Sequence, residues 1–278
     1  MAKILIADSG FTKTDWRLIQ SDGSIEQART PGINPYYQTQ EEMLTVIKDL
    51  YDQIPDKVDE IYYYGTGCSS GTNRKKIADL LAKYYPSAVI DVNHDLLAAA
   101  RSLCGEEAGI ACILGTGTNS CLYDGVKITQ NVPSLGWAIA DEGGGTYLGK
   151  TLVTDYYRKD MPADLRKVFK DNFGLTKDNF LTYIYQEPMP GRFLASFAKF
   201  IGQHINEPYM HQLVARGFEI FITKNIMKYE DYDQVPVHFT GSIAFYFSNV
   251  LRQVAQEKGI YVKHISEFPI AGLTLFHQ

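Results

Sequence analysis

The sequence predicts an α/β protein made of two duplicated lobes, and the prediction rests on its length and on an internal repeat. At 278 residues the chain is long for one compact core. Near its start an apolar run, Ile4–Ala7, ends in Asp8, and a turn rich in hydroxylated residues leads into the next strand, Trp16–Ile19. The same order of strands and turns returns at Gly109–Ile128. Two copies are too few for a solenoid, so a duplicated two-lobe protein fits better.

The first half continues with alternating strands and helices. A turn signal at Ser21–Ser24 precedes a third strand that we expect to end near Arg29. Pro31–Pro35 is predicted to be a loop, because two prolines and a glycine exclude a helix or a central strand. Apolar periodicity then predicts, in order, helix Glu41–Tyr51, strand Ile61–Tyr64, helix Arg74–Tyr85 capped by Asn73, strand Val89–Val92, and a helix from Asp95 to about Leu103.

The second half begins with the repeat and is otherwise mostly helical. The repeat gives strand Gly109–Leu114, the turn Gly115–Ser120, strand Cys121–Tyr123, the turn Asp124-Gly125 and strand Val126–Ile128. The helices expected after it are Gly144–Arg158, Pro162–Asn172, Thr176–Gln186, Arg192–Asn206, Pro208–Tyr229, Ser242–Glu257 and Pro269–Phe276. Strands are expected at Val235–Phe239 and Tyr261–Ile265. No low-complexity linker separates the halves, so we expect a compact hinge near Leu103–Ala108.

Composition limits the class of protein and of partner. The hydrophobic fraction of 45% and the charged fraction of 21% are typical of a soluble globular protein. A net charge of −5 without a Lys/Arg cluster argues against a nucleic-acid partner. The four cysteines, Cys68, Cys104, Cys112 and Cys121, form no CxxC pair, so reduced thiols are expected instead of a zinc site or disulfides. Without a signal-peptide pattern or a membrane-length apolar stretch, the chain is expected to be cytoplasmic and to have no membrane partner.

The first turn and two later segments invite a phosphate-binding interpretation. Backbone N–H groups and hydroxyls after Asp8 can hold phosphate oxygens while its carboxylate holds hydrated Mg²⁺, although an ordinary polar hairpin fits equally well. Gly144–Thr151 matches the Walker A pattern, but two carboxylates precede it and periodicity places Lys150 inside a helix. Gly65–Gly71 only loosely matches a dinucleotide fingerprint, so a backbone loop beside a ligand cleft is favoured.

Three polar positions keep two interpretations each. Asp95 is expected to be the cap of its helix, a general base, or both. Asp141-Glu142, which precedes three glycines, is either a solvated loop or a site for a hydroxyl-rich ligand. Gly241-Ser242 either approaches a flat ligand such as adenine or contains a helix cap at Ser242. The six histidines show no metal-binding spacing, and no GxSxG motif occurs.

Five segments in one order carry a resemblance to a known family: ADSGFTKTDW, VNHDLLAAA, ILGTGTNS, LGWAIADEGG and HFTGSIA. The chain resembles the N-acetylglucosamine kinase and BadF-type ATPase family of the actin-like ATPase superfamily over nearly its whole length. The resemblance implies two duplicated ribonuclease-H-like lobes with a mixed five-stranded sheet in each. It places residues 1–105, joined by the C-terminal helix 267–278, in the first lobe, and residues 106–266, with a helical insertion, in the second.

The resemblance also implies roles for individual residues. Asp8 is expected to hold hydrated Mg²⁺, and Asp95 is expected to take the proton from a sugar hydroxyl. The ATP and phosphate contacts implied are Ser9, Gly10, Thr12, Lys13, Gly115, Thr116, Gly117, Thr118, Gly241 and Ser242. The sugar contacts implied are Asn34, Asp95, Gly136, Asp141 and Glu142. The family's first phosphate loop reads DGGGTKT, so Ser9 and Phe11 replace glycines here, and Phe11 limits close backbone approach to phosphate.

The implied function is a MgATP-dependent amino-sugar kinase. N-acetylglucosamine is expected ahead of glucosamine, with Asp95 as the base and transfer in the interlobe cleft. An ATPase that powers a partner protein is one alternative, although the cysteines lack the grouping with which such activators hold an iron–sulfur cluster. A non-catalytic sugar or nucleotide sensor is the other. Dimers are common in such folds, and the sequence leaves open the oligomeric state, the hexose and its reacting hydroxyl.

Overall fold

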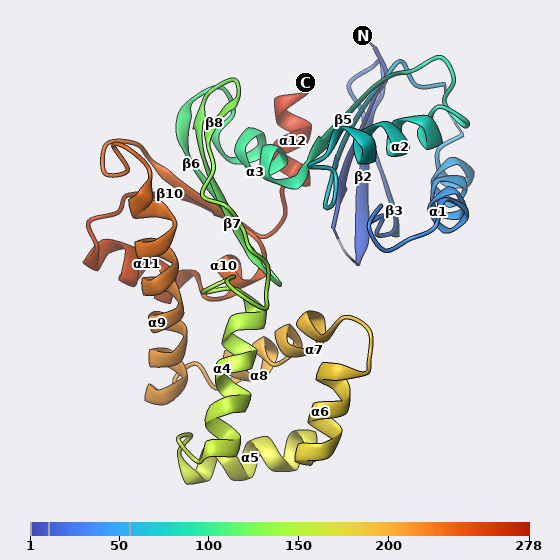
Figure 1. Cartoon of the computed structure of the whole chain (residues 1–278). Coiled ribbons are helices and arrows are strands. Elements are labelled where there is room, and N and C mark those ends of the chain that lie inside the picture. The colour runs from blue at the N-terminus through green and yellow to red at the C-terminus, as the bar shows by residue number, and fades with distance from the viewer. Residues whose placement is uncertain (1, 11, 56) are drawn as a thin grey trace. The chain divides into compact units, whose positions relative to one another are not determined.

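The computed structural model describes residues 2–10, 12–55 and 57–278, which divide into two compact units. The first unit comprises Met1–Glu107, Asp124–Ile128 and Phe268–Gln278, and the second comprises Ala108–Tyr123 and Thr129–Glu267. Each of the two sheets has five strands, and helices pack against them (Figure 1). The predicted α/β class with a five-stranded sheet in each half is confirmed.

The sheet of the first unit has the order β3-β2-β1-β4-β5. Its strands are β1 (Ile4–Ser9), β2 (Lys13–Ile19), β3 (Ile25–Pro31), β4 (Glu60–Gly65) and β5 (Val89–His94). β2 is antiparallel to both β1 and β3, whereas β4 is parallel to both β1 and β5. The sheet is therefore mixed, as predicted: β1, β3, β4 and β5 run in one direction and β2 runs in the other.

The second sheet repeats this topology. Its strands are β6 (Ala108–Leu114), β7 (Thr118–Asp124), β8 (Ile128–Gln130), β9 (Val237–Thr240) and β10 (Val262–Ser266). Read from β8, the order β8-β7-β6-β9-β10 matches the first sheet strand for strand, and β9 is parallel to both β6 and β10. The duplication inferred from the hairpins is confirmed and extends to whole sheets. The predicted strand at Val126–Ile128 starts later, because the Asp124 carboxylate accepts hydrogen bonds from the backbone of Val126 and Lys127 and prolongs the turn.

Alternation along β1 separates the two faces of the first sheet. Leu5 and Ala7 belong to the core cluster that includes residues of α1 (Gln40–Gln53) and α2 (Gly71–Leu81). Ile6 belongs to a second cluster, with residues of α3 (Asp95–Cys104) and α12 (Ile270–Phe276), on the other face (Figure 1). Since neighbouring side chains of a strand point to opposite faces, Asp8 shares the face of Ile6 and α3.

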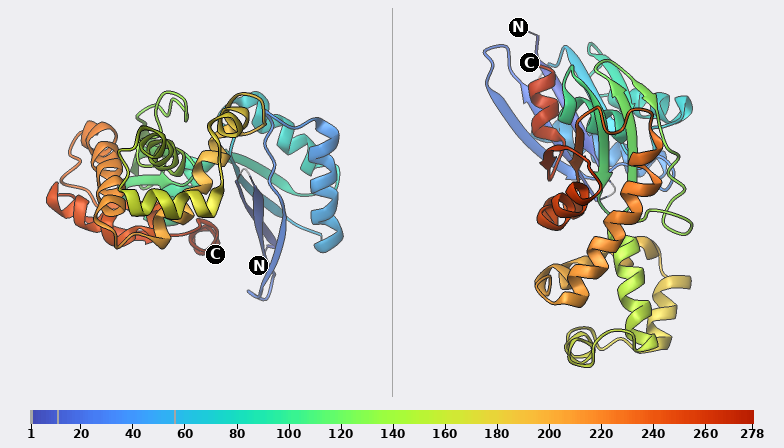
Figure 2. Two further views of the ribbon diagram at one scale, coloured as in Figure 1. Left: turned by 90° about the horizontal axis from the view of Figure 1, so that it is seen from below. Right: turned by 90° about the vertical axis from the view of Figure 1, so that its left-hand side faces the viewer.

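The helices of the second unit differ from the prediction in their breaks. They are α4 (Gly145–Arg158), α5 (Ala163–Phe173), α6 (Lys177–Tyr185), α7 (Pro190–Ser196), α8 (Ala198–Gln203), α9 (Pro208–Lys224), the 3₁₀ helix η1 (Ile226–Lys228), α10 (Ser242–Tyr246) and α11 (Ser248–Glu257). Three helices predicted as continuous are split, at Phe197, at Asn225 and at Phe247. The rings of Phe197 and Phe247 are buried in the core. Packing of these rings overrides the local helical pattern. α4 to α8 extend beyond the end of the second sheet (Figure 2).

The start of α2 was also predicted wrongly. The helix begins at Gly71 and is capped by Ser70, whose hydroxyl accepts a hydrogen bond from the backbone N–H of Asn73. Asn73 lies inside the first turn, and its side chain instead donates to the carbonyl of Gly67 at 2.8 Å. Among the described residues, no helix is both long enough and apolar enough to cross a membrane.

An aromatic cluster fastens the residue after α12 to the first sheet. The His277 ring stacks on Tyr62 with centroids 3.9 Å apart, and its Nε2 lies 2.9 Å from the Tyr64 hydroxyl. Arg101 donates a hydrogen bond to that same hydroxyl at 2.7 Å. Burial, reinforced by the positive charge of Arg101, lowers the pKa of His277 to about 4.

We therefore expect acid to destabilise the protein through His277. The unfolded chain binds this proton near the ordinary histidine pKa of about 6.5, and the folded chain binds it only near 4. The unfolded state thus binds more protons between these values, so stability falls as pH falls through that window. The loss should be on the order of 1–3 kcal/mol. The measurement is urea unfolding of wild type and His277→Gln at pH 7 and pH 4.5, and identical pH dependence of the two proteins would contradict the expectation.

Candidate active site

The predicted site residues of the first unit gather where its parallel strands end. Ser9 at the end of β1 lies opposite Gly65 at the end of β4, and Gly65 lies opposite His94 at the end of β5. The chain positions next to these three ends are Asp8, Thr66 and Asp95. Ligands of α/β proteins bind at the carboxyl edge of parallel strands. This edge is therefore the expected place for a ligand in the first unit.

Asp8 is a half-buried carboxylate in an unfavourable electrostatic environment. Burial, together with the nearby carboxylates of Asp15 and Asp95, raises the pKa of Asp8 to about 7, and Lys13 opposes that shift. Asp15 is different: burial favours its neutral form, but ion pairs with Lys13 (2.7 Å) and Arg29 (2.8 Å) lower its pKa overall. No cation pairs with Asp8 within the described ranges.

This environment suits a bound Mg²⁺ ion. A cation would offset the charge that burial and the neighbouring carboxylates disfavour on Asp8. In the part of the chain that the structure describes, no cluster of three or more His, Cys, Asp or Glu residues could hold a metal by itself. Mg²⁺ in phosphate-transfer sites is commonly held by one or two carboxylates, substrate phosphates and water. Asp8 fits that mode of binding, and an all-protein metal cage does not fit.

Asp95 does not cap its helix, which corrects one of its two interpretations. The cap of α3 is His94, whose Nδ1 accepts a hydrogen bond from the backbone N–H of Leu97 at 3.3 Å. Asp95 is the first residue of the helix, and its Oδ2 accepts a hydrogen bond from the Thr66 hydroxyl at 2.8 Å. Its Oδ1 has no hydrogen-bond partner among the described residues. One oxygen of the carboxylate therefore accepts a hydrogen bond from Thr66, and the other can accept one from a ligand.

Asn34 is the predicted sugar-binding residue of the first unit, and it is 5% exposed. Its side-chain Oδ1 accepts a hydrogen bond from the backbone of Tyr36 at 3.0 Å, and its own N–H donates to Gln38 Oε1 at 2.7 Å. The Gln38 side chain also donates to the Gly32 carbonyl. Hydrogen bonds among its own residues thus stabilise the loop that carries Asn34. The side-chain NH₂ of Asn34 takes part in none of these bonds.

The first turn offers fewer side chains to phosphate than its sequence suggests. The Ser9 hydroxyl is buried and lies 2.8 Å from the Thr14 hydroxyl. Lys13 pairs with Asp15, and its ammonium also lies 3.8 Å from the centre of the Phe268 ring. Thr12 is exposed, and the N–H of Gly10 donates to the Lys13 carbonyl. Phe11, where the family has glycine, lies outside the described residues.

The predicted second phosphate loop, Gly115–Thr118, accepts backbone hydrogen bonds from the first residues of α4. The N–H groups of Gly145 and Thr146 donate to the carbonyls of Gly115 (2.8 Å) and Thr116 (2.9 Å). In a Walker A loop these first helical N–H groups would face phosphate. The Walker interpretation is therefore wrong, and Lys150 lies inside α4 as the periodicity predicted.

The Asp141-Glu142 segment contacts the second loop and α9. Asp141 has a left-handed backbone with φ of 65°, and its Oδ1 accepts a hydrogen bond from the Thr118 N–H at 3.2 Å. Burial raises the pKa of Asp141. Glu142 forms an ion pair with Lys224 at 2.7 Å. Gly136 precedes both in the same irregular segment and has φ of 76°.

A cavity of about 680 Å³ lies beside the second loop, wholly within the second unit. Gly115, Thr116 and Ser242 of the prediction line it. Gly241, next to Ser242, must be glycine: its φ is 113° and a Cβ atom would collide with the carbonyl of Leu114. Gly241 also occupies the cap position of α10, so a cap by Ser242 is excluded. Further lining residues that sequence reasoning missed include Lys199, Gln203 and Tyr246; no spacing pattern marks them.

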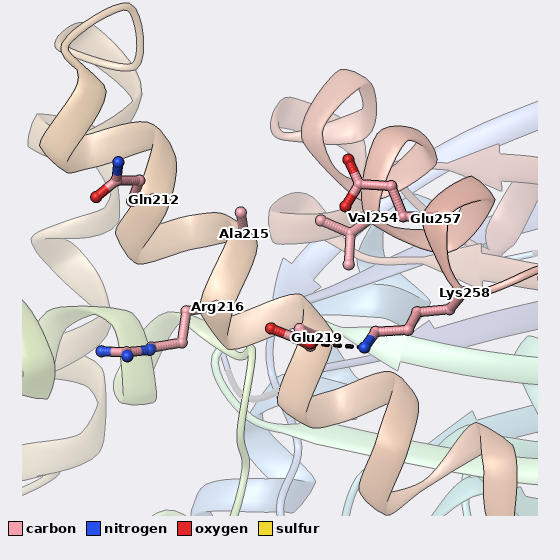
Figure 3. Close-up of a pocket in the computed structure, with 7 residues that line it drawn as sticks. All are labelled: Gln212, Ala215, Arg216, Glu219, Val254, Glu257 and Lys258. Carbon is pink, nitrogen blue, oxygen red and sulfur yellow. Dashed lines mark hydrogen bonds and ion pairs between the residues drawn. The ribbon is translucent and has the colours of Figure 1, made fainter.

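A second cavity, of about 280 Å³, lies between α9 and α11 (Figure 3). Arg216 and Gln212 line it, and Lys258 pairs with Glu219 across it at 2.6 Å. None of the predicted site residues reaches this cavity. The edges of the two sheets are therefore the stronger candidates for the site.

Comparison with solved structures finds full-length similarity. A protein from Porphyromonas gingivalis described as a "putative N-acetylglucosamine kinase" is 38% identical, with 99% of this chain and 98% of that chain covered and a TM-score of 0.93. A protein of the same description from Chromobacterium violaceum is 16% identical, with 100% and 99% covered and a TM-score of 0.77. A ROK hexokinase from Thermus thermophilus is 14% identical, with 98% and 97% covered and a TM-score of 0.57. The last two show the fold alone. No protein-family model matches the chain, and no curated protein gives a significant match.

We expect Asp8→Asn to stabilise the metal-free protein at alkaline pH. The unfolded chain loses this proton near the ordinary aspartate pKa of about 3.9, and the folded chain loses it near 7. The folded state thus binds more protons in that window, and wild-type stability falls as pH rises through it. Asn stays neutral, so the variant should be more stable at pH 8 by on the order of 1–3 kcal/mol, and nearly equal in stability at pH 4.

The measurement is urea unfolding in EDTA at both pH values. Asp52→Asn, which removes an exposed carboxylate from α1, is the matched control and should change neither value. An Asp8→Asn protein less stable than wild type at pH 8 would contradict the assigned environment.

Proposed function

The chain belongs to the N-acetylglucosamine kinase family of the actin-like ATPase superfamily, and we propose that it transfers the γ-phosphoryl group of MgATP to a hydroxyl of an amino sugar. N-acetylglucosamine is the first substrate to test and glucosamine the next. The observation that carries the proposal is the grouping of Asp8, Asp95 and the Asn34 loop around the carboxyl edge of the first sheet. These residue types match a metal-binding carboxylate, a general base and a sugar-binding amide.

The second unit supplies a plausible place for the nucleotide. Its cavity of about 680 Å³ is large enough for adenosine and is bordered by the Gly115–Thr118 loop and by Ser242. In the proposal, Tyr246 offers its ring to the adenine base, and backbone N–H groups of the loop receive phosphate oxygens. Adenosine is thus proposed to bind the second unit, whereas Asp95 and Asn34, the proposed base and sugar-binding amide, belong to the first.

The proposed chemistry assigns one step to each carboxylate. Asp95 accepts a hydrogen bond from the reacting sugar hydroxyl at Oδ1 and takes its proton as the new oxygen–phosphorus bond forms. ADP leaves with the electrons of the broken bond. Asp8 would hold Mg²⁺, which when bound neutralises charge on the phosphate oxygens. Asn34 would orient the sugar through its side-chain NH₂.

Two other functions of the fold are less well supported. An ATPase that drives a partner through an iron–sulfur cluster needs accessible cysteines, and all four cysteines here are buried. A sensor without catalysis needs neither a general base nor a metal ligand. ADP release with a panel of hexoses separates the three. A kinase releases ADP only with sugar, an activator releases it without sugar, and a sensor releases none.

Asp95→Asn should abolish most of the sugar-dependent ADP release. If Asp95 is the base, kcat should fall by roughly 10²–10⁴. Asn keeps a side-chain oxygen able to accept the Thr66 hydrogen bond, so the fold and the KM for ATP should change little. Asp91→Asn is a suitable control, because Asp91 is an exposed residue on the neighbouring strand. Wild-type kcat in Asp95→Asn would remove it from the role of base.

Tyr246→Ala should weaken nucleotide binding selectively. Stacking of a base on an aromatic ring contributes about 1–3 kcal/mol, so the KM for ATP should rise by roughly 5- to 100-fold with little change in kcat. Tyr261→Ala is the matched control, since Tyr261 is 67% exposed, Tyr246 is 69% exposed, and only Tyr246 lines the cavity. Equal KM values in the two variants would remove Tyr246 from the nucleotide site.

A further inference from the structure

The turn between β4 and α2 contains two residues that the predicted site does not include. Thr66 and Gly67 belong to the glycine-rich segment that loosely matched a dinucleotide fingerprint. We propose that they form a positioning pair, in which Thr66 holds the base Asp95 by a hydrogen bond and Gly67, which lacks a side chain, leaves the space that the sugar-binding Asn34 occupies. The inference rests on the proposed kinase function. It explains how the base and the sugar-binding amide are positioned relative to each other.

Thr66 is anchored before it contacts Asp95. Its backbone N–H donates to the Ser9 carbonyl at 3.0 Å, which fixes the residue to the end of β1. Its hydroxyl then donates to Asp95 Oδ2 at 2.8 Å. Hydrogen bonds to charged groups are stronger than neutral ones. The bond restrains rotation of the carboxylate and leaves Oδ1 for the sugar hydroxyl.

Gly67 makes room for the loop that carries Asn34. Its φ is 82°, and a Cβ atom there would lie 2.9 Å from Asn34 Oδ1 and 3.1 Å from atoms of Pro35 and Tyr36. Any larger residue must push the Asn34 loop away or change the turn. Because the Asn34 side chain is itself the nearest neighbour, the displacement would fall on the group proposed to bind sugar.

The turn is held from its other side by α2. Asn73, which is 7% exposed, donates its side-chain amide to the Gly67 carbonyl at 2.8 Å. Thr66 and Gly67 are thus hydrogen-bonded to β1, to α2 and to Asp95, and Gly67 lies close against the Asn34 loop. A turn that served only to connect β4 with α2 would not need a hydrogen bond to a half-buried carboxylate.

The two halves of the pair predict different kinetic effects. Thr66→Val keeps the shape of the side chain and removes the donor, so kcat should fall about 10- to 100-fold. The KM values for sugar and ATP should stay within about threefold, because neither Asn34 nor the nucleotide cavity is altered. Thr66→Ser restores the donor and should recover most of kcat. Thr72→Val, the same change at an exposed position of α2, is the control and should behave as wild type.

Gly67→Ala should act on the sugar instead. Displacement of Asn34 should raise the KM for the sugar about tenfold or more, with kcat at saturating sugar reduced less than in Thr66→Val. Gly71→Ala is the control, since a Cβ at Gly71 has no neighbour within 4 Å. If Gly67→Ala does not fold, Asn73→Ala tests the same step by releasing the Gly67 carbonyl, and should raise the same KM.

These kinetic experiments distinguish failure of the positioning pair from failure of the proposed kinase function. Wild-type protein that phosphorylates no sugar would overturn the proposed function, and the pair with it. Active wild type together with wild-type kcat in Thr66→Val, or with no rescue by Thr66→Ser, would overturn the pair alone. Equal losses in kcat and KM for both variants, accompanied by a lowered melting temperature, would show that the turn is structural only.

Discussion

The parallel pairing of β1, β4 and β5 is the constraint on which the first half of the site depends. It sets Ser9, Gly65 and His94 in one row and so brings together the chain positions beside them, Asp8, Thr66 and Asp95. A slip of β1 by one residue would turn Asp8 away from α3, because side chains alternate between faces. The second sheet repeats the constraint: β6 and β9 are parallel, and the turns after them carry Gly115 and Gly241. One backbone arrangement, used twice, thus generates both sets of turns that are proposed to bind ligands.

Of the two carboxylates on the first hairpin, Asp15 is stabilised by ion pairs and Asp8 is not. Asp15 forms ion pairs with two cations, Lys13 and Arg29. Asp8 has no such partner among the residues described, and its pKa is raised to about 7. A carboxylate in that position lowers stability when ionised. Proteins keep such groups where a ligand or ion supplies the missing charge. The unfavourable environment of Asp8 therefore supports the proposal that its carboxylate binds a cation.

The sequence predicted the repeating parts of this structure better than the single contacts. The duplicated strands and the helical position of Lys150 follow from periodicity, which many residues carry together. Caps depend on one hydrogen bond each, so His94 and Ser70 displaced the equally suitable Asp95 and Asn73. The helix breaks at Phe197 and Phe247 depend on burial of a ring in the core. Thr66 and Tyr246 could not be found at all, because their partners lie far along the chain or line a cavity.

The contacts of the first turn indicate how an acidic protein can bind a polyphosphate. Lys13, the cation of that turn, is already paired with Asp15, and the hydroxyl of Ser9 is buried against Thr14. Phosphate binding in the proposal then relies on backbone N–H groups, on Thr12 and on a cation held by Asp8. Backbone amides select for the shape of the phosphate chain but neutralise little of its charge. In the proposal, Mg²⁺ that arrives with the nucleotide neutralises phosphate charge, and Asp8 links metal binding to nucleotide binding.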